Sequence, residues 1–113
     1  MTTILVKKTK DNYRGFTCTG HAGYAESGND IVCAAVSVLV INTINAIEAF
    51  AKDPMEVVAG EADGVIDVVF LNPVNERTAL LMDTMILGLT DIEKQYGKKY
   101  LRLKFEDVIA ALR

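Results

Sequence analysis

Residues that commonly bind metal ions are scarce in this chain of 113 residues. It contains one histidine and two cysteines, and its carboxylates are scattered along the sequence. Protein zinc sites use clusters of Cys and His at short, regular spacings, and the sequence has no such cluster. It therefore predicts no metal site. A Cys-x-x-Cys redox motif is absent as well.

Positive charge is not in excess either. The chain has 12 Lys and Arg against 15 Asp and Glu, which gives a net charge of −3 and a pI near 5.1. A nucleic acid bound through its phosphates calls for a basic surface, so no direct nucleic-acid partner is expected. A Gly-rich phosphate loop between a strand and a helix is also missing. We therefore predict that the protein uses no cofactor.

Long apolar segments are absent. Residues Met1–Lys8 place their positive charges after a very short apolar run, which is the reverse of a secretory signal. The longest apolar run, Ile31–Ile41, is too short to span a bilayer, and polar residues interrupt its continuation at Asn42, Asn45 and Glu48. We expect a cytoplasmic protein without a membrane partner, in which both cysteines are thiols.

The chain has the length and patterns of one domain, which we place over residues 1–113. Alternating segments predict strands at Ile4–Thr9, at Phe16–His21, in a pair within Glu56–Leu71 about Asp63-Gly64, and at Tyr100–Phe105.

Two helices are predicted between these strands. The first follows Asp30 and ends at Asp53-Pro54, and the second has Pro73 in its first turn and Gly97 as its C-cap. The first helix carries one mostly apolar stripe, made of Val32, Val36, Leu39, Thr43, Ala46, Ile47 and Phe50. This order of elements indicates an α+β fold, a mainly antiparallel sheet with the two long helices packed on it.

One stretch, Gly20–Ser37, holds the histidine and one cysteine with a Gly-rich loop between them. Asp30 stands directly before an apolar run and suits a helix N-cap, with Asn29 as the alternative. Cys33 would then be the third helical residue, near the free amides and the positive end of the helix dipole. A helix N-terminus and a neighbouring imidazolium both stabilise a thiolate. Cys33 and His21 are therefore candidates for a catalytic dyad.

Local sequence alone leaves this dyad open. A cysteine in an apolar helix is most often a core residue, and a lone histidine is often structural or exposed. Ser37 lies one helical turn after Cys33, and its hydroxyl either bonds near the site or bonds back to the Cys33 carbonyl. Cys18 shares a strand face with Phe16 and is expected in the core.

The chain resembles the bacterial ribosomal-processing cysteine proteases, the Prp family, in the pattern Gly20-His-Ala-Gly23 followed by Gly28-Asn-Asp-Ile-Val-Cys-Ala-Ala-Val-Ser37. Members are small homodimeric proteases that remove the N-terminal extension of a large-subunit ribosomal protein, at an extended hydrophobic segment. The resemblance implies the same partner, activity and homodimer here. It makes His21 the general base and Cys33 the nucleophile, with Asp30 and Ser37 in supporting positions.

The expected mechanism begins with attack of the Cys33 thiolate on a peptide carbonyl, after which His21 protonates the leaving amine. Amides at the helix start, including that of Cys33, would bind the oxyanion. Asp30 could orient His21 or act only as the cap. The loop before the helix could close over the substrate, with flexible points at Gly23, Ser27 and Gly28.

Two other classes of protein compete with the protease. One is a non-catalytic ribosome-assembly binding module in which Cys33 is a core residue and His21 a turn residue. The other is a thiol redox or acyl-transfer protein, and its redox form would need Cys18 to resolve an oxidised Cys33.

Overall fold

The computed structural model describes residues 1–20, 27–60 and 65–108, with residues 27–30 described by their backbone only. Over these residues a sheet of five strands forms in the order β3-β4-β2-β1-β5. The strands are β1 (Thr2–Lys8), β2 (Tyr13–Thr19), β3 (Met55–Gly60), β4 (Val65–Phe70) and β5 (Leu101–Asp107).

All neighbouring strands of the sheet are antiparallel except β1 and β5, which are parallel. In the β1–β2 hairpin, Ile4 pairs with Cys18 and Val6 pairs with Phe16, and all four side chains are buried. The alternation that predicted these strands therefore also identifies their inward face. The α+β fold is confirmed, and so is the core position of Cys18.

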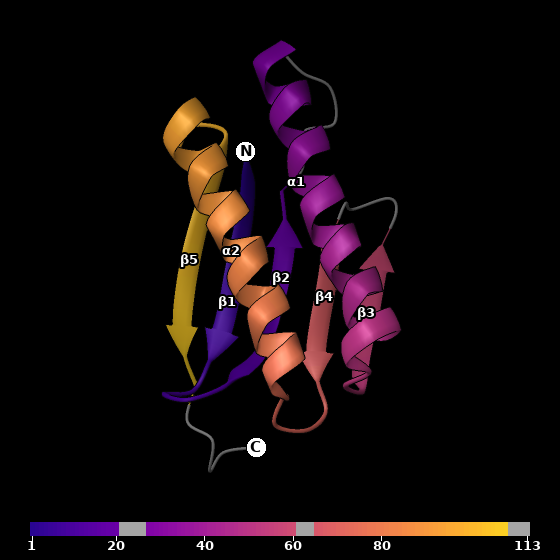
Figure 1. Cartoon of the computed structure of the whole chain (residues 1–113). Coiled ribbons are helices and arrows are strands. Elements are labelled where there is room, and N and C mark those ends of the chain that lie inside the picture. The colour runs from indigo at the N-terminus through magenta and orange to yellow at the C-terminus, as the bar shows by residue number, and fades with distance from the viewer. Residues whose placement is uncertain (21–26, 61–64, 109–113) are drawn as a thin grey trace.

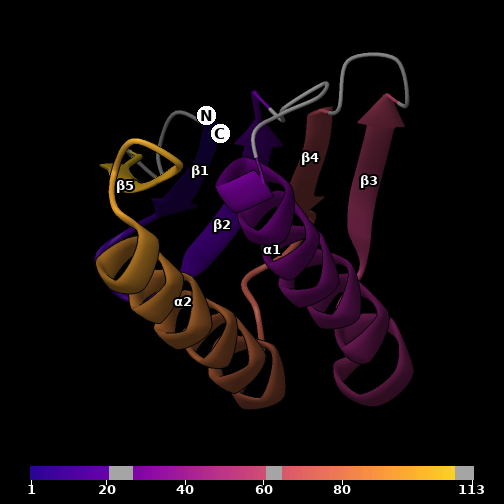
Figure 2. The same cartoon turned by 90° about the horizontal axis from the view of Figure 1, so that it is seen from above.

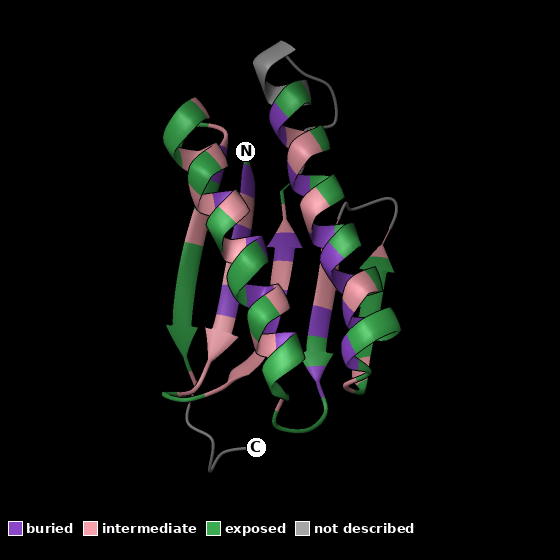
Figure 3. Ribbon diagram, viewed as in Figure 1, coloured by how far each residue is buried: buried purple, intermediate pink, exposed green. Residues whose placement is uncertain are grey.

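Two helices, α1 (Ser27–Ala46) and α2 (Glu76–Tyr96), lie side by side across one face of this sheet (Figures 1 and 2). The buried residues lie between the helices and the sheet (Figure 3). Leu39 of α1 approaches Gly88 of α2 so closely that a Cβ on Gly88 would lie 2.9 Å from the Leu39 side chain. A small residue at this position lets the two helices pack together.

The first helix continues as a π-helical turn, η1 (Ile47–Ala51), and Lys52 in the left-handed conformation ends it just before Asp53-Pro54. Phe50, the last residue of the predicted apolar stripe, does not share the buried face, since its side chain is 66% exposed and Ala51 is buried instead. The wider π turn brings the later residue over the core. The expectation that this helix is too short and too polar to span a bilayer is not met, because Ile31–Ala51 is long and apolar enough by length and composition, a test that a core helix also passes.

The second helix begins later than predicted. Asn75 is its N-cap and accepts hydrogen bonds from the amides of Arg77 (2.9 Å) and Thr78 (3.1 Å). Pro73 therefore precedes the helix and does not lie in its first turn. Gly97, with φ of +102°, is the C-cap as predicted.

Candidate active site

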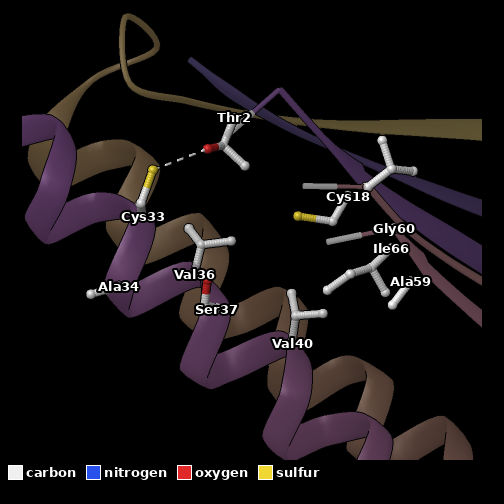
Figure 4. Close-up of a pocket in the computed structure, with 11 residues that line it drawn as sticks. Thr2, Cys18, Cys33, Ala34, Val36, Ser37, Val40, Ala59, Gly60 and Ile66 are labelled. Carbon is white, nitrogen blue, oxygen red and sulfur yellow. Dashed lines mark hydrogen bonds between the residues drawn. The ribbon is translucent and has the colours of Figure 1, made fainter. Parts of the chain in front are cut away.

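One end of the sheet gathers the elements that surround Cys33. The start of β1, the ends of β2 and β3, the start of β4 and the N-terminal half of α1 meet there (Figure 1). Cys33 is half-buried. Its sulfur lies 3.7 Å from the Thr2 hydroxyl oxygen, within hydrogen-bond range, and points from α1 toward the start of β1 (Figure 4).

The backbone of α1 begins at Ser27, so the prediction that Asp30 or Asn29 is the N-cap is wrong. Four successive residues, Ser27 to Asp30, include three types that commonly cap helices, and the local pattern favoured the last of them. The helix includes all four. Ser27 and Gly28 consequently belong to its first turn and not to a loop.

This earlier start changes the surroundings of Cys33, which becomes the seventh residue of the helix. Only the first four amides of a helix lack an intrahelical acceptor, so the amide of Cys33 belongs to the hydrogen-bond ladder. The predicted use of this amide for the oxyanion is therefore wrong. With a rise of 1.5 Å per residue, Cys33 lies about 9 Å along the axis from the first helical residue.

A cavity of about 420 Å³ lies next to the Cys33 sulfur. From α1 it is lined by Cys33, Ala34, Val36, Ser37 and Val40. The sheet contributes Thr2, Cys18, Ala59, Gly60, Val65 and Ile66. Figure 4 shows Cys33 and Val36 of α1 facing Thr2 and Cys18 of the sheet. The walls of the cavity are mostly aliphatic. Such a cavity suits an apolar side chain next to a nucleophile.

Cys18 is buried in the wall of this cavity. Burial, followed by the negative charge of an ionised Cys33, raises the pKa of the Cys18 thiol to about 11. A raised thiol pKa means that the neutral form persists at pH 7, and only the thiolate is a strong nucleophile. Of the two cysteines, Cys18 is the one suited to packing.

The other predicted residues fall in two groups. His21 and Gly23 lie outside the described residues, and so does the side chain of Asp30. Ser37 is exposed and lines the cavity one turn beyond Cys33 (Figure 4). Among the described residues, no group of three or more His, Cys, Asp or Glu side chains could hold a metal ion.

Thr2 lies beside Cys33 but was not among the residues predicted from the sequence. Its side chain is 2% exposed and faces the helices together with Ile4 and Val6. The period of two in a strand carried the signal, because positions 2, 4 and 6 share one face. Because the predicted strand began at Ile4, it did not include this hydroxyl.

Comparison with known proteins finds one matching family model, "Cysteine protease Prp", over residues 1–101. The ribosomal processing cysteine protease Prp of Bacillus subtilis is 36% identical over 85 residues, which cover 72% of this chain and 76% of that protein.

Two solved structures of the Staphylococcus aureus processing protease Prp share the fold, and each match covers 94% of this chain and 100% of that one. One is a complex with a substrate peptide, with a TM-score of 0.86 at 24% identity. The other has a covalently linked product peptide, with a TM-score of 0.84 at 25% identity.

Proposed function

Because the chain belongs to the Prp family of ribosomal processing cysteine proteases, we propose that Cys33 and His21 form its catalytic dyad. The substrate would be the N-terminal extension of a large-subunit ribosomal protein. The observation that carries this proposal is the Cys33 sulfur, which lies beside an apolar cavity at the end of the sheet. His21 is bonded to Gly20, which directly follows β2, and β2 ends at this same side of the sheet.

In this proposal the Cys33 thiolate attacks the scissile carbonyl and forms a tetrahedral intermediate. His21 then protonates the leaving amine, and the C–N bond breaks to give a thioester on Cys33. Water, deprotonated by His21, attacks the thioester and releases the carboxylic acid, which regenerates the Cys33 thiolate and the protonated His21. The supporting roles of Asp30 and Ser37 stay predictions within this scheme.

The cavity beside Cys33 would receive an apolar side chain next to the scissile bond. A cavity of about 150 Å³ holds benzene, so the observed 420 Å³ is ample for an aromatic side chain. β3 is one edge of the sheet, and its last two residues, Ala59 and Gly60, line the cavity. We therefore favour β3 over β5 as the edge along which an extended substrate pairs.

We further propose that the enzyme is a cytoplasmic homodimer. Large apolar side chains on α1 are exposed, namely Ile31 (54%), Val38 (67%) and Ile41 (48%), and a second copy could cover them. A gel-filtration mass equal to one subunit at micromolar concentration would refute the dimer. Recovery of the protein in the membrane fraction of its cells would refute the location.

The experiment that tests the activity is mass spectrometry of the organism's own extended ribosomal protein after incubation with enzyme. The variants are Cys33→Ala and His21→Ala, with Gln95→Ala on the exposed side of α2 as the matched control. Cleavage at one bond near the N-terminus by the wild type and Gln95→Ala alone would support the dyad. If the folded wild type leaves a substrate intact that another protease can cut, the binding module becomes the better assignment.

A further inference from the structure

Thr2 holds its hydroxyl at a fixed place beside the nucleophile. Its amide donates a 2.9 Å hydrogen bond to the Tyr100 carbonyl, and Thr2 pairs with Leu101 in the parallel β1–β5 ladder. A β-branched side chain has few χ1 choices. Backbone and side chain are thus both constrained, with Thr2 only 2% exposed.

The partner of this hydroxyl is the Cys33 sulfur, at 3.7 Å (Figure 4). A buried hydroxyl is costly unless it forms a hydrogen bond. The next inward positions of β1, Ile4 and Val6, are aliphatic. If packing were the only requirement at position 2, a valine would fill the space equally well. Thr2 therefore differs from its neighbours in one chemical property, a hydroxyl within hydrogen-bond distance of the Cys33 sulfur.

We propose that Thr2 is a further active-site residue, whose hydroxyl donates to the Cys33 thiolate and holds the sulfur in the orientation for attack. This inference rests on the proposed function in which Cys33 is the nucleophile. A hydrogen bond to an ionised group favours the charged form and is stronger than one between neutral groups. The hydroxyl therefore both stabilises the thiolate and fixes its position.

Two substitutions separate the hydroxyl from the packing. Thr2→Val keeps the shape of the side chain and removes the donor, and Thr2→Ser keeps the donor. Thr43→Val is the matched control, because Thr43 is also a buried threonine but donates its hydroxyl to the Leu39 carbonyl (2.7 Å). It lies ten residues along the helix from Cys33, or about 15 Å.

The first readout is the rate at which iodoacetamide alkylates Cys33 at pH 7, located by mass spectrometry, which needs no substrate. The second is the pair kcat and KM for cleavage of the extension peptide. Thr2→Val should lower both the alkylation rate and kcat about tenfold, the factor that 1.36 kcal/mol gives, with KM within about twofold. Thr2→Ser and Thr43→Val should stay within about threefold of the wild type.

Equal losses in Thr2→Val and Thr2→Ser would overturn the proposal, because packing would then explain them. Unchanged alkylation and unchanged kcat in Thr2→Val would also overturn it. If the wild type fails to cleave the peptide while the alkylation pattern holds, the proposed substrate fails and the assignment of Thr2 stands.

Discussion

A small substitution at Gly20 should lower catalytic activity by more than its effect on stability explains. It joins β2 to His21 and has φ of +77°. A Cβ at this position would lie 2.6 Å from the Met1 carbonyl oxygen, against the 3.4 Å of ordinary contact. In Gly20→Ala, Met1 must retreat by most of an ångström, and Thr2 follows it in the chain.

The expected magnitudes come from this geometry. A residue forced into positive φ costs about 1–3 kcal/mol of stability, and relief of the clash adds to this cost because the obstructing oxygen belongs to the Met1 backbone. The displaced group is Thr2, whose hydroxyl we expect to be worth about tenfold in rate. We therefore expect kcat/KM of Gly20→Ala to fall about tenfold, a larger effect than its loss of stability explains.

Gly15 supplies the matched control. A Cβ there would lie 2.2 Å from the Val68 carbonyl oxygen, so Gly15→Ala forces β2 and β4 apart, at a cost of about 1–3 kcal/mol. Gly15 is five residues before Gly20, or about 17 Å along the strand, so kcat/KM per folded molecule should be unchanged.

The assay measures urea unfolding by circular dichroism, together with kcat/KM normalised to the Cys33 thiol that can be alkylated. Two results would refute the reasoning. One is a Gly20→Ala enzyme within about twofold of the wild type. The other is a Gly15→Ala enzyme that loses as much activity per folded molecule as Gly20→Ala.

Three further predictions concern the frame around the site. Asn75→Ala removes the cap of α2 and the donor to the Ala51 carbonyl (3.0 Å), so urea unfolding should show a loss of about 1–2 kcal/mol; no loss would contradict the cap. Thr78 has a buried hydroxyl that bonds to none of the described residues, so Thr78→Val should raise the free energy of unfolding by about 1–3 kcal/mol, and a fall would show that the hydroxyl has a partner. Because burial and the charge of Cys33 raise the pKa of Cys18 to about 11, the neutral thiol persists below that value and Cys18 should resist alkylation at pH 9 in the folded protein. In Cys33→Ala the charge of Cys33 is removed while the burial of Cys18 remains. The pH at which half of Cys18 is alkylated should therefore fall only part of the way toward the ordinary value for a thiol. A full return to that value would contradict the dominant role of burial.

Local sequence patterns predicted most of the helices and strands. Alternation marked β1, β2 and β5. The predicted turn at Asp63-Gly64 lies outside the described residues, between the end of β3 and the start of β4. The start of a helix was less predictable where several neighbouring residues could each serve as the N-cap. Ser27, Asn29 and Asp30 are all good caps, and local sequence does not rank them against the tertiary contacts of the helix.

The candidate site likewise has one part that the sequence predicts and one part that it does not. Cys33 and Ser37 are four residues apart on one helix, so their shared side of the cavity follows from the helical period. The opposite wall combines Thr2 with residues from β3 and β4, which are more than fifty positions away in the chain. No local sequence pattern predicts this proximity, because it depends on the order and register of the strands.

The pairing of β1 with β5 has a consequence for the order of folding. The backbone of Thr2 is held by Tyr100 and Leu101, so the first and last strands of the sheet must meet before the hydroxyl is fixed beside Cys33. Such a contact of high sequence separation is slow to form. With the role proposed for Thr2, a nascent chain that still lacks β5 would carry Cys33 without this support, and proteolytic activity should follow completion of the sheet.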